Sequence, residues 1–264
     1  MSKIKVAIIV PLYRSINDTE KISLLHLTHF LGKYNKFFLT PSSLSRSKVP
    51  ISQFKIIKFP DKYFTGIKEY SQLMSTKNFY SEFSDYDYIL IHQLDALVFS
   101  DQLNQWCNKG YDYMGAPWFK HRIGDFSHKK GLPADVGNGG FSLRKVKSFI
   151  KIIDLAINLS KRETDNPFIQ KLWFIEAVLT GQSHQQWLNA PPSCYPFNED
   201  GFWSLEAPKY DNKFRVAPFT EALQFSFEKY PRRCFELNND QLPFGCHAWS
   251  RYDKEFWLPY LLQK

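Results

Sequence analysis

The stretch that decides the fold is Asp87-Tyr88-Ile89-Leu90-Ile91-His92, which runs directly into Gln93-Leu94-Asp95. Its continuous apolar centre is typical of a strand that is buried on both faces of a sheet. Helical stretches are predicted on either side of it, over residues 66–80 and 101–109. A buried strand between helices predicts an α/β protein with a mainly parallel central sheet and helices on both faces.

Three earlier segments extend this pattern toward the amino terminus. Residues 5–10 form an apolar run that ends at a proline, and residues 37–40 and 54–59 are predicted as further strands. A helix is predicted between the first two, because Asn17 offers an amino-terminal cap and Gly32 a stop. The alternation of strands and helices indicates that all of these strands belong to a single sheet.

The ligand of such a sheet binds beyond the carboxyl ends of its strands. Residues 11–15 and 92–95 follow two predicted strands, so we expect them to form the walls of a site. In the second half, helices are predicted over 145–159 and 167–180. No repeat or long linker interrupts the chain, and residues 1–264 are expected to form a single domain.

The composition excludes several classes of protein. Of the 264 residues, 44% are hydrophobic and 23% charged, which excludes a chain that is wholly disordered, collagenous or coiled coil. No apolar run reaches the length of about 18 residues expected of a membrane-spanning helix, and residues 6–10 are too short for a signal peptide. We therefore expect a cytoplasmic protein. Its four scattered cysteines form no CxxC pair and are expected to be reduced thiols.

Positive charge is concentrated near the amino terminus. Residues 1–68 hold 12 Lys and Arg against 3 Asp and Glu. Three interpretations stay open: a solvated face, a site for an anionic ligand such as a nucleotide diphosphate, and contact with the anionic inner face of the cell membrane. No nucleic-acid partner is expected, since no helix-turn-helix, zinc-finger or RNP signature accompanies the charge. The 17% aromatic content suits a core and also a surface that stacks on sugars.

Four motifs contain residues that could bind a ligand or take part in catalysis. In Gln93-Leu94-Asp95 the carboxylate follows a buried strand, where it can hold Mg²⁺ or Mn²⁺ against a diphosphate or simply cap the next helix. The glycine cluster 137–140 permits close approach of backbone to a ligand, or is a tight turn. Asn198-Glu199-Asp200, followed by two aromatic residues expected to be exposed, can supply a base to a sugar hydroxyl or be a turn.

The fourth motif is Pro243-Phe244-Gly245-Cys246-His247-Ala248-Trp249. His247 is a candidate metal ligand through a neutral ring nitrogen, and the alternative is a core histidine. His26 and His29 also share a helical face, but they have no third ligand in the pattern and are not predicted to bind metal.

In this order the four motifs resemble those of glycosyltransferases of the GT-A fold. Within that superfamily the chain resembles a microbial glycosyltransferase-like family in segments 88–96, 115–118, 137–144 and 243–249, and the resemblance extends over nearly the whole chain. It implies a single Rossmann-like domain, with a nucleotide-sugar-binding half at about 1–130 and an acceptor-facing half at about 131–264.

The resemblance also implies residue roles. Asp200 would be the catalytic base with Glu199 beside it, and Asp95 and His247 would hold Mn²⁺ or Mg²⁺. The residues that would bind the nucleotide-sugar are Pro11, Tyr13, Arg14, Gln93, Asp95, Gly139 and Gly140. One departure is Gln93, which stands where the metal motif has its first acid and would instead hydrogen-bond the ribose or the diphosphate.

The implied activity is metal-dependent, inverting transfer of a sugar from a nucleotide-sugar to a hydroxyl of a glycan acceptor. The donor is expected to be UDP-linked, and the acceptor a lipid-linked precursor of a surface polysaccharide. A nucleotidyltransferase and a non-catalytic carbohydrate-binding protein are the alternatives. Residues 119–133, with two glycines and little apolar periodicity, are expected to form either a lid over the site or a solvated loop.

Overall fold

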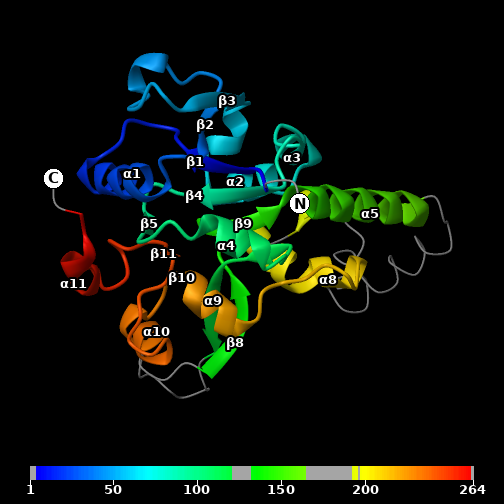
Figure 1. The fold of residues 1–264 in the computed structure, drawn as a ribbon. Helices are drawn as coiled ribbons and strands as arrows, with labels where there is room; N and C mark the ends of the chain where they lie inside the picture. Colours follow the sequence, from blue (N-terminus) through cyan, green and yellow to red (C-terminus); the bar gives the residue numbers. More distant parts are fainter. Residues whose placement is uncertain (1–3, 121–131, 165–191, 196, 263–264) are drawn as a thin grey trace.

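The computed structural model describes residues 4–120, 132–164, 192–195 and 197–262. Its central sheet has six strands in the order β3 (Lys55–Phe59), β2 (Asn35–Pro41), β1 (Val6–Pro11), β4 (Tyr88–His92), β9 (Phe141–Lys145) and β6 (Tyr113–Met114) (Figure 1). The first four strands are parallel, and β9 pairs antiparallel with both β4 and β6. The predicted α/β class with a mainly parallel sheet is confirmed.

Helices cover both faces of the sheet. On one face, α1 (Asp18–Leu31) and α4 (Leu103–Asn108) pack against alternate residues of β1 such as Ile8 and Val10. On the other face, Ala7 and Ile9 meet α2 (Ile67–Leu73), α3 (Lys77–Ser81) and α5 (Val146–Thr164). This division follows from the alternation of side chains along a strand, and it explains why β1 is apolar throughout.

Local sequence sets the ends of two predicted helices. The Asn17 side chain accepts a hydrogen bond from the Glu20 amide at 2.9 Å, and the Glu20 carboxylate accepts one from the Asn17 amide at 2.8 Å, which begins α1 with a capping box. The helix expected over 66–80 is divided into α2 and α3, because the Thr76 hydroxyl accepts a hydrogen bond from the Phe79 amide and starts a new helix.

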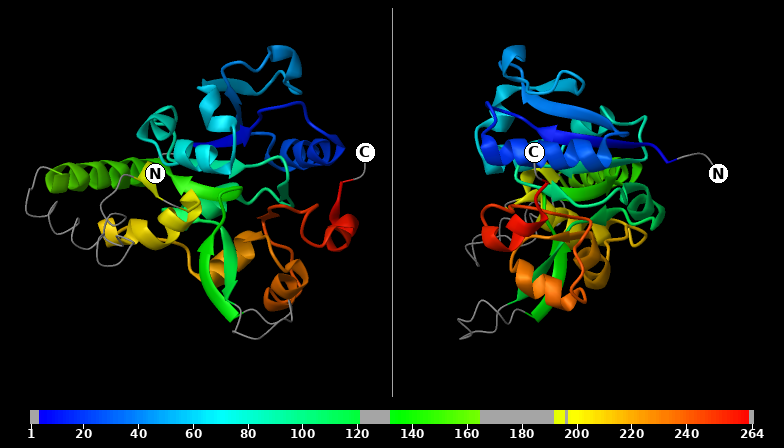
Figure 2. Two further views of the ribbon diagram at one scale, coloured as in Figure 1. Left: turned by 180° about the vertical axis from the view of Figure 1, so that it is seen from behind. Right: turned by 60° about the vertical axis from the view of Figure 1, so that its left-hand side comes forward.

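A smaller sheet lies beyond β4, in the order β10 (Ser226–Phe227), β11 (Gly245–Cys246) and β5 (Leu97–Val98). A separate hairpin of β7 (Ala116–Lys120) and β8 (Leu132–Gly137) extends away from the central sheet beside α9 (Phe219–Phe225), as Figures 1 and 2 show. The remaining helical segments are η1 (Arg46–Lys48), η2 (Asp61–Phe64), η4 (Pro192–Cys194), α7 (Glu199–Gly201), η5 (Phe202–Glu206), α8 (Ala207–Tyr210), α10 (Pro231–Leu237), α11 (Lys254–Trp257) and η6 (Leu258–Tyr260).

Some expectations need correction or lie outside the described residues. The two ends of the expected loop 119–133 are not loop, because they belong to the paired strands β7 and β8. That middle, 121–131, and the helix predicted over 167–180 lie outside the described residues. Three of the four cysteines, Cys107, Cys234 and Cys246, are buried free thiols, as predicted. No helix in the described parts of the chain is long and apolar enough to cross a membrane.

The strand order reverses at one place in the sheet. From β1 the chain proceeds to β2 on one side, whereas β4 lies on the other side of β1. The connections after β1 and β4 therefore leave in opposite directions at their carboxyl ends. In open α/β sheets this switch point is where ligands bind.

Candidate active site

Two of the predicted wall segments meet at this switch point. Ile9 pairs with Ile91, so Pro11 at the end of β1 lies alongside Gln93 just after β4. Tyr13 is 53% exposed there. The Arg14 guanidinium donates two hydrogen bonds to the Glu20 carboxylate, at 3.0 and 2.8 Å, and an anionic ligand of Arg14 would compete with that partner.

The smaller sheet brings His247 to Asp95. Cys246 of β11 pairs antiparallel with Leu97 of β5, and one step further along this register places His247 beside the residues that precede Leu97. The Trp249 amide donates a hydrogen bond to the Asp95 carbonyl at 3.2 Å, which holds the segment after β11 against the segment before β5. As a result, His247 Nε2 lies 3.2 Å from Asp95 Oδ1, although the two residues are far apart in the sequence.

The same sheet gives His247 two further partners. The His247 amide donates to the Phe227 carbonyl at 2.9 Å, which places the next residue, Glu228, against the ring. Nδ1 lies 3.1 Å from Glu228 Oε1, and Nε2 lies 3.1 Å from Gln93 Oε1. Burial alone would lower the pKa of His247, but hydrogen bonds to the carboxylates of Asp95 and Glu228 outweigh it and raise the pKa to about 9.

The glycine cluster continues the ladder between β4 and β9. The Gln93 amide donates a hydrogen bond to the Gly140 carbonyl at 2.8 Å, so this glycine lies opposite the first residue of the Gln93-Leu94-Asp95 motif. Asn138 has a φ of 125° and closes the turn with its side-chain oxygen, which accepts hydrogen bonds from the amides of Gly140 and Phe141 at 2.7 and 3.3 Å. A φ this far above the left-handed helical region is unusual for any residue except glycine, and these two hydrogen bonds hold it.

Side chains lie so close to the next two residues that a Cβ on either glycine would clash with them. A Cβ on Gly139 would lie 2.5 Å from Glu199 Oε1, and a Cβ on Gly140 would lie 2.0 Å from His247 Nε2. Neighbouring Cα atoms are about 3.8 Å apart, so the two side chains flank a very short piece of backbone. The structure thus brings the second, third and fourth sequence motifs together.

This contact gives a first prediction. Gly140→Ala should push the imidazole away from Asp95 and Gln93, because the added methyl group would occupy the position of Nε2. The titration midpoint of His247, followed by NMR of its ring, should fall from about 9 by at least about 1 unit, equivalent to about 1.4 kcal/mol.

Gly201→Ala is the matched control, since its backbone is helical and its new Cβ would come no closer than 3.3 Å to the Tyr195 hydroxyl. An unchanged His247 titration in Gly140→Ala would show that the ring is not held where the structure places it.

Glu199 is anchored on the other side of the loop. One carboxylate oxygen accepts from Arg144 Nη2 at 3.0 Å, and the other accepts from the Ser71 hydroxyl of α2 at 2.9 Å. Arg144 is fully buried and also donates to the Tyr80 hydroxyl at 3.0 Å. Both Glu199 oxygens therefore accept hydrogen bonds within the protein, and its predicted role toward an acceptor stays a prediction.

Asp200 is in a different situation, although it is the next residue. The hydrogen bond to its carboxylate comes from the Gly201 amide at 2.9 Å. Burial, followed by the negative charge of Glu199, raises the pKa of Asp200 to about 6. A carboxylate with a pKa near the working pH is well suited to accept a proton, and the role of Asp200 as the base stays a prediction.

The rings that follow these acids are a correction to the sequence analysis. Phe202 and Trp203 were expected to offer an exposed stacking face, but both are buried in the core with Phe149. The exposed ring near the acids is Phe197, which is 73% exposed and packs edge-on against Tyr195 with ring centroids 5.7 Å apart. Phe202 and Trp203 follow the acids in the sequence, but neither ring is available to a ligand.

Two site residues had no assigned role in the sequence analysis. Glu228 holds the far side of the His247 ring, and Arg144 holds Glu199. Arg144 closes the recognised segment 137–144, and an arginine within an otherwise buried strand was the signal available for it. Glu228 had no comparable signal.

Comparison with solved structures finds several matches at low sequence identity. The galactosyltransferase LgtC, solved with donor and acceptor sugar analogs, is 11% identical with a TM-score of 0.49, covering 98% of this chain and 97% of that chain. A glycosyltransferase involved in glycosylation of the major capsid of PBCV-1 is 10% identical, with a TM-score of 0.45 and coverage of 95% and 96%. Apo GlyE of Streptococcus pneumoniae TIGR4 is 14% identical, with a TM-score of 0.44 and coverage of 98% and 61%.

No curated protein matches the chain. A family model matches residues 53–247, which is about three quarters of the chain and includes every motif from Gln93 to His247. The chain belongs to that family, which is described as "Protein of unknown function (DUF5672)".

Proposed function

We propose that the protein transfers a sugar from a nucleotide-sugar to a hydroxyl of a glycan acceptor, with inversion by a single displacement. The observation that supports this most is the convergence of four motifs at the switch point of the sheet. Asp95 and His247 lie on one side of the Gly139–Gly140 loop, and Glu199 lies on the other side, directly before Asp200. In this proposal the loop would separate the diphosphate of the donor from the base.

Asp200 would act on the acceptor. With a pKa of about 6, its carboxylate is mostly ionised at pH 7 and still basic enough to share a proton in the transition state. The acceptor oxygen would attack the sugar carbon while its proton passes to Asp200, and the nucleotide diphosphate would leave from the opposite face. The buried Arg144–Glu199 pair would keep the base in place.

A divalent ion would bind on the opposite side of the loop. His247 Nε2 lies 3.2 Å from Asp95 Oδ1 and 3.1 Å from Gln93 Oε1, and Glu228 would orient the ring from behind as an outer carboxylate does in metal sites. Among the described residues no group of three or more His, Cys, Asp and Glu could hold a metal. The set therefore suits Mn²⁺ or Mg²⁺ only with phosphate oxygens as further ligands. When bound, the ion would neutralise charge on the leaving diphosphate.

Metal binding should release a proton, which is a second prediction. At pH 7 the His247 ring is protonated in the metal-free protein, because its pKa is about 9, and a ligand nitrogen must be neutral. Calorimetry in buffers of different ionisation enthalpy should show release of about one proton on Mn²⁺ binding in the presence of UDP. The affinity should rise about tenfold per pH unit between pH 6 and 8 and level off above pH 9.

Glu228→Gln serves as the comparison for this experiment. It removes one of the two carboxylates that raise the His247 pKa, so it should reduce proton release at pH 8 while leaving Asp95 in place. Binding of Mn²⁺ with no proton release and no pH dependence would mean that His247 is not a ligand.

The proposed donor is UDP-linked, and the proposed acceptor is a lipid-linked glycan. Exposed lysines such as Lys48, Lys55 and Lys58 could bring the protein to an anionic membrane, and co-sedimentation with anionic lipid vesicles tests that contact.

Incubation with a panel of nucleotide-sugars and glycan acceptors, with and without EDTA, tests the activity itself. Free nucleotide diphosphate together with glycosylated product supports the proposal. Pyrophosphate released from a nucleoside triphosphate would instead indicate a nucleotidyltransferase, and no turnover with retained sugar binding would indicate a carbohydrate-binding protein.

A further inference from the structure

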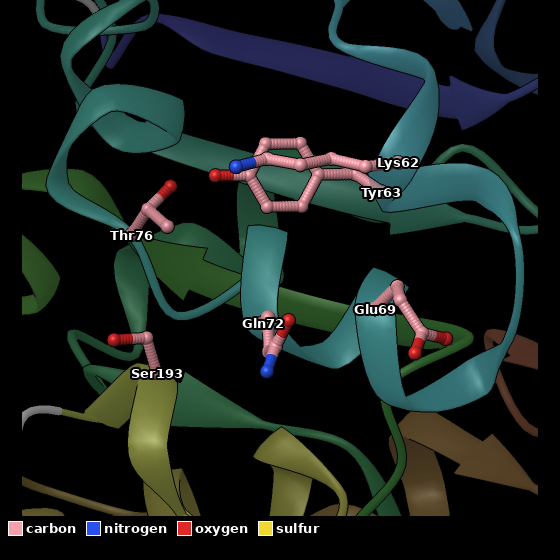
Figure 3. A pocket seen from close by; sticks show the side chains of 6 residues that line it. All are labelled: Lys62, Tyr63, Glu69, Gln72, Thr76 and Ser193. Atoms are coloured by element: carbon pink, nitrogen blue, oxygen red, sulfur yellow. The ribbon is translucent and has the colours of Figure 1, made fainter.

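A hollow of about 350 Å³ lies against α2, on the face of the central sheet that also carries α5. Figure 3 shows its lining, which consists of Lys62, Tyr63, Glu69, Gln72, Thr76 and Ser193. None of these side chains belongs to the candidate active site. The contacts that bear on that site lie on the opposite face, between α1 and residues 254–262, the carboxyl-terminal segment (Figure 1).

The small sheet beside the proposed metal site has very short strands. β10, β11 and β5 contain two residues each. Glu228 directly follows β10, His247 directly follows β11, and Asp95 lies two residues before β5. A ladder of this length is not stable without packing against other elements. The geometry of the three side chains therefore depends on what covers the sheet.

Trp257 of α11 covers the two outer strands of this sheet. Its ring stacks on Phe99, the residue after β5, with centroids 5.4 Å apart and an interplanar angle of 6°. The same ring lies 6.2 Å from that of Phe227 in β10. Trp257 is fully buried in one hydrophobic cluster with Leu97 and Cys246. It thus contacts the flanks of β5 and β10, with β11 between them.

His26 of α1 fastens the end of the carboxyl-terminal segment. Its Nδ1 lies 2.9 Å from the Val98 carbonyl of β5, and its Nε2 lies 2.9 Å from the Leu262 amide. A carbonyl only accepts hydrogen bonds and an amide N–H only donates them, so the ring carries its proton on Nδ1 and accepts at Nε2. The completely buried His26 therefore joins α1, β5 and this segment as a neutral ring of one defined tautomer.

A proton on Nε2 would break this arrangement, because two N–H groups would then face each other. Burial lowers the pKa of His26 more than its contact with the Val98 carbonyl raises it. The titratable side chains that act on the ring are two further histidines, His29 of α1 and His92 of β4. No carboxylate of the described residues is among them, so a charged ring would have no ion-pair partner there.

We propose that the carboxyl-terminal segment clamps the small sheet, that neutral His26 keeps this clamp closed, and that protonation of His26 opens it. In the closed state α11 holds β5 and β10 on either side of β11, which keeps Asp95, His247 and Glu228 together. His26 is thus a positioning residue. The consequence for binding of Mn²⁺ and UDP rests on the proposed function, whereas the clamp itself does not.

Three variants test the clamp. His26→Leu removes both hydrogen bonds and keeps an apolar side chain. His26→Gln offers one donor and one acceptor but cannot take up a proton. His29→Gln is the matched control, because His29 is exposed and lies three residues further along the same helix. Thermal unfolding of each variant establishes that it folds.

Hydrogen exchange measured by NMR follows the clamp at single amides, as protection factors corrected for the intrinsic exchange rate. The Leu262 amide reports the contact with His26. The amides of His247 and Trp249, which donate to the Phe227 and Asp95 carbonyls, report the small sheet. Amides of β1 and β4 report the central sheet and distinguish local opening from global unfolding.

In wild type, protection at these three reporters should be constant above about pH 7 and fall below about pH 6.5, by at most about tenfold per pH unit. The direction follows because the open state binds the proton more readily than the closed state does. His26→Leu should lose at least about tenfold of the protection at pH 7.5. His26→Gln should lose less, and neither variant should keep the pH dependence, whereas His29→Gln should behave like wild type.

Calorimetry at pH 7.5 then measures binding of Mn²⁺ in the presence of UDP. It should weaken by at least about tenfold in His26→Leu and by less than about threefold in His29→Gln. Lost protection at all three reporters, in a protein whose wild type binds neither Mn²⁺ nor UDP, would support the clamp and contradict the proposed function. Lost protection with unchanged Mn²⁺ binding would contradict the link between the clamp and the site.

Other outcomes would overturn the clamp itself. In His26→Leu these are unchanged protection of the Leu262 amide, a loss confined to that amide, or an equal loss throughout β1 and β4. A fall of protection below pH 6.5 that is the same in wild type and His26→Gln would assign the pH dependence to another group.

Discussion

Asp200→Asn should lower kcat for glycosyl transfer by about 10²–10⁴-fold, the usual contribution of a general base. The substitution keeps the shape of the side chain and the hydrogen bond from the Gly201 amide, and it removes the charge that takes the proton. The Kd of the donor nucleotide should change by less than about threefold, because a base acts in the transition state rather than in donor binding.

The wild-type pH profile provides an independent measurement. The base must be ionised, so kcat should fall as the pH drops through about 6, by about tenfold per pH unit well below it. Asp240→Asn is the matched control, since Asp240 is exposed and has a φ of 55° that Asn tolerates. Near-normal turnover in Asp200→Asn, or a profile that is flat between pH 5 and 7, would remove Asp200 from the base role.

The central sheet was predictable because each buried parallel strand has a local signature. Runs such as Val6–Val10 and Ile89–Ile91 are apolar on both faces, and only a strand covered by helices on both sides can use such a run. The two-residue strands β5 and β11 have no signature of that kind. They form only because two segments about 150 residues apart in the sequence pair with each other. A hydrophobic pattern within either segment cannot predict that pairing.

This limit bears directly on the site. Asp95 and His247 were expected to act together, but only on the resemblance to a known family, since it is the pairing of β5 with β11 that joins them. The prediction that Phe202 and Trp203 are exposed was wrong for a related reason. Aromatic residues occur both in cores and on binding surfaces, and local sequence does not tell which of the two a given ring joins.

Arg144 was the most informative residue that received no role. A charged side chain in the middle of a strand is compatible with an exposed edge, a ligand contact or a buried ion pair, and the sequence around it does not separate these. The structure shows a buried pair with Glu199 at 3.0 Å, in which the arginine is completely buried and the glutamate is 4% exposed. This arrangement supports the second large effect that we expect.

Removal of either partner of this pair should lower the free energy of unfolding by about 3–5 kcal/mol, because the remaining charge would stay buried without compensation. The variants are Arg144→Met and Glu199→Met, measured by urea unfolding. Arg144→Met also leaves the hydroxyls of Tyr80 and Ser142 without their contacts to the guanidinium. Arg233→Met is the matched control, since its pair with Glu236 is exposed and should contribute less than about 1 kcal/mol.

The double variant Arg144→Met/Glu199→Met distinguishes charge burial from simple loss of packing. It leaves no buried charge, so its cost should be clearly smaller than the sum of the single costs, with a coupling energy of about 1–3 kcal/mol. Additive losses would mean that the two side chains contribute independently. A single Arg144→Met variant that unfolds like wild type would mean that the pair does not hold Glu199 against Gly139, and the positioning of Asp200 would then need another explanation.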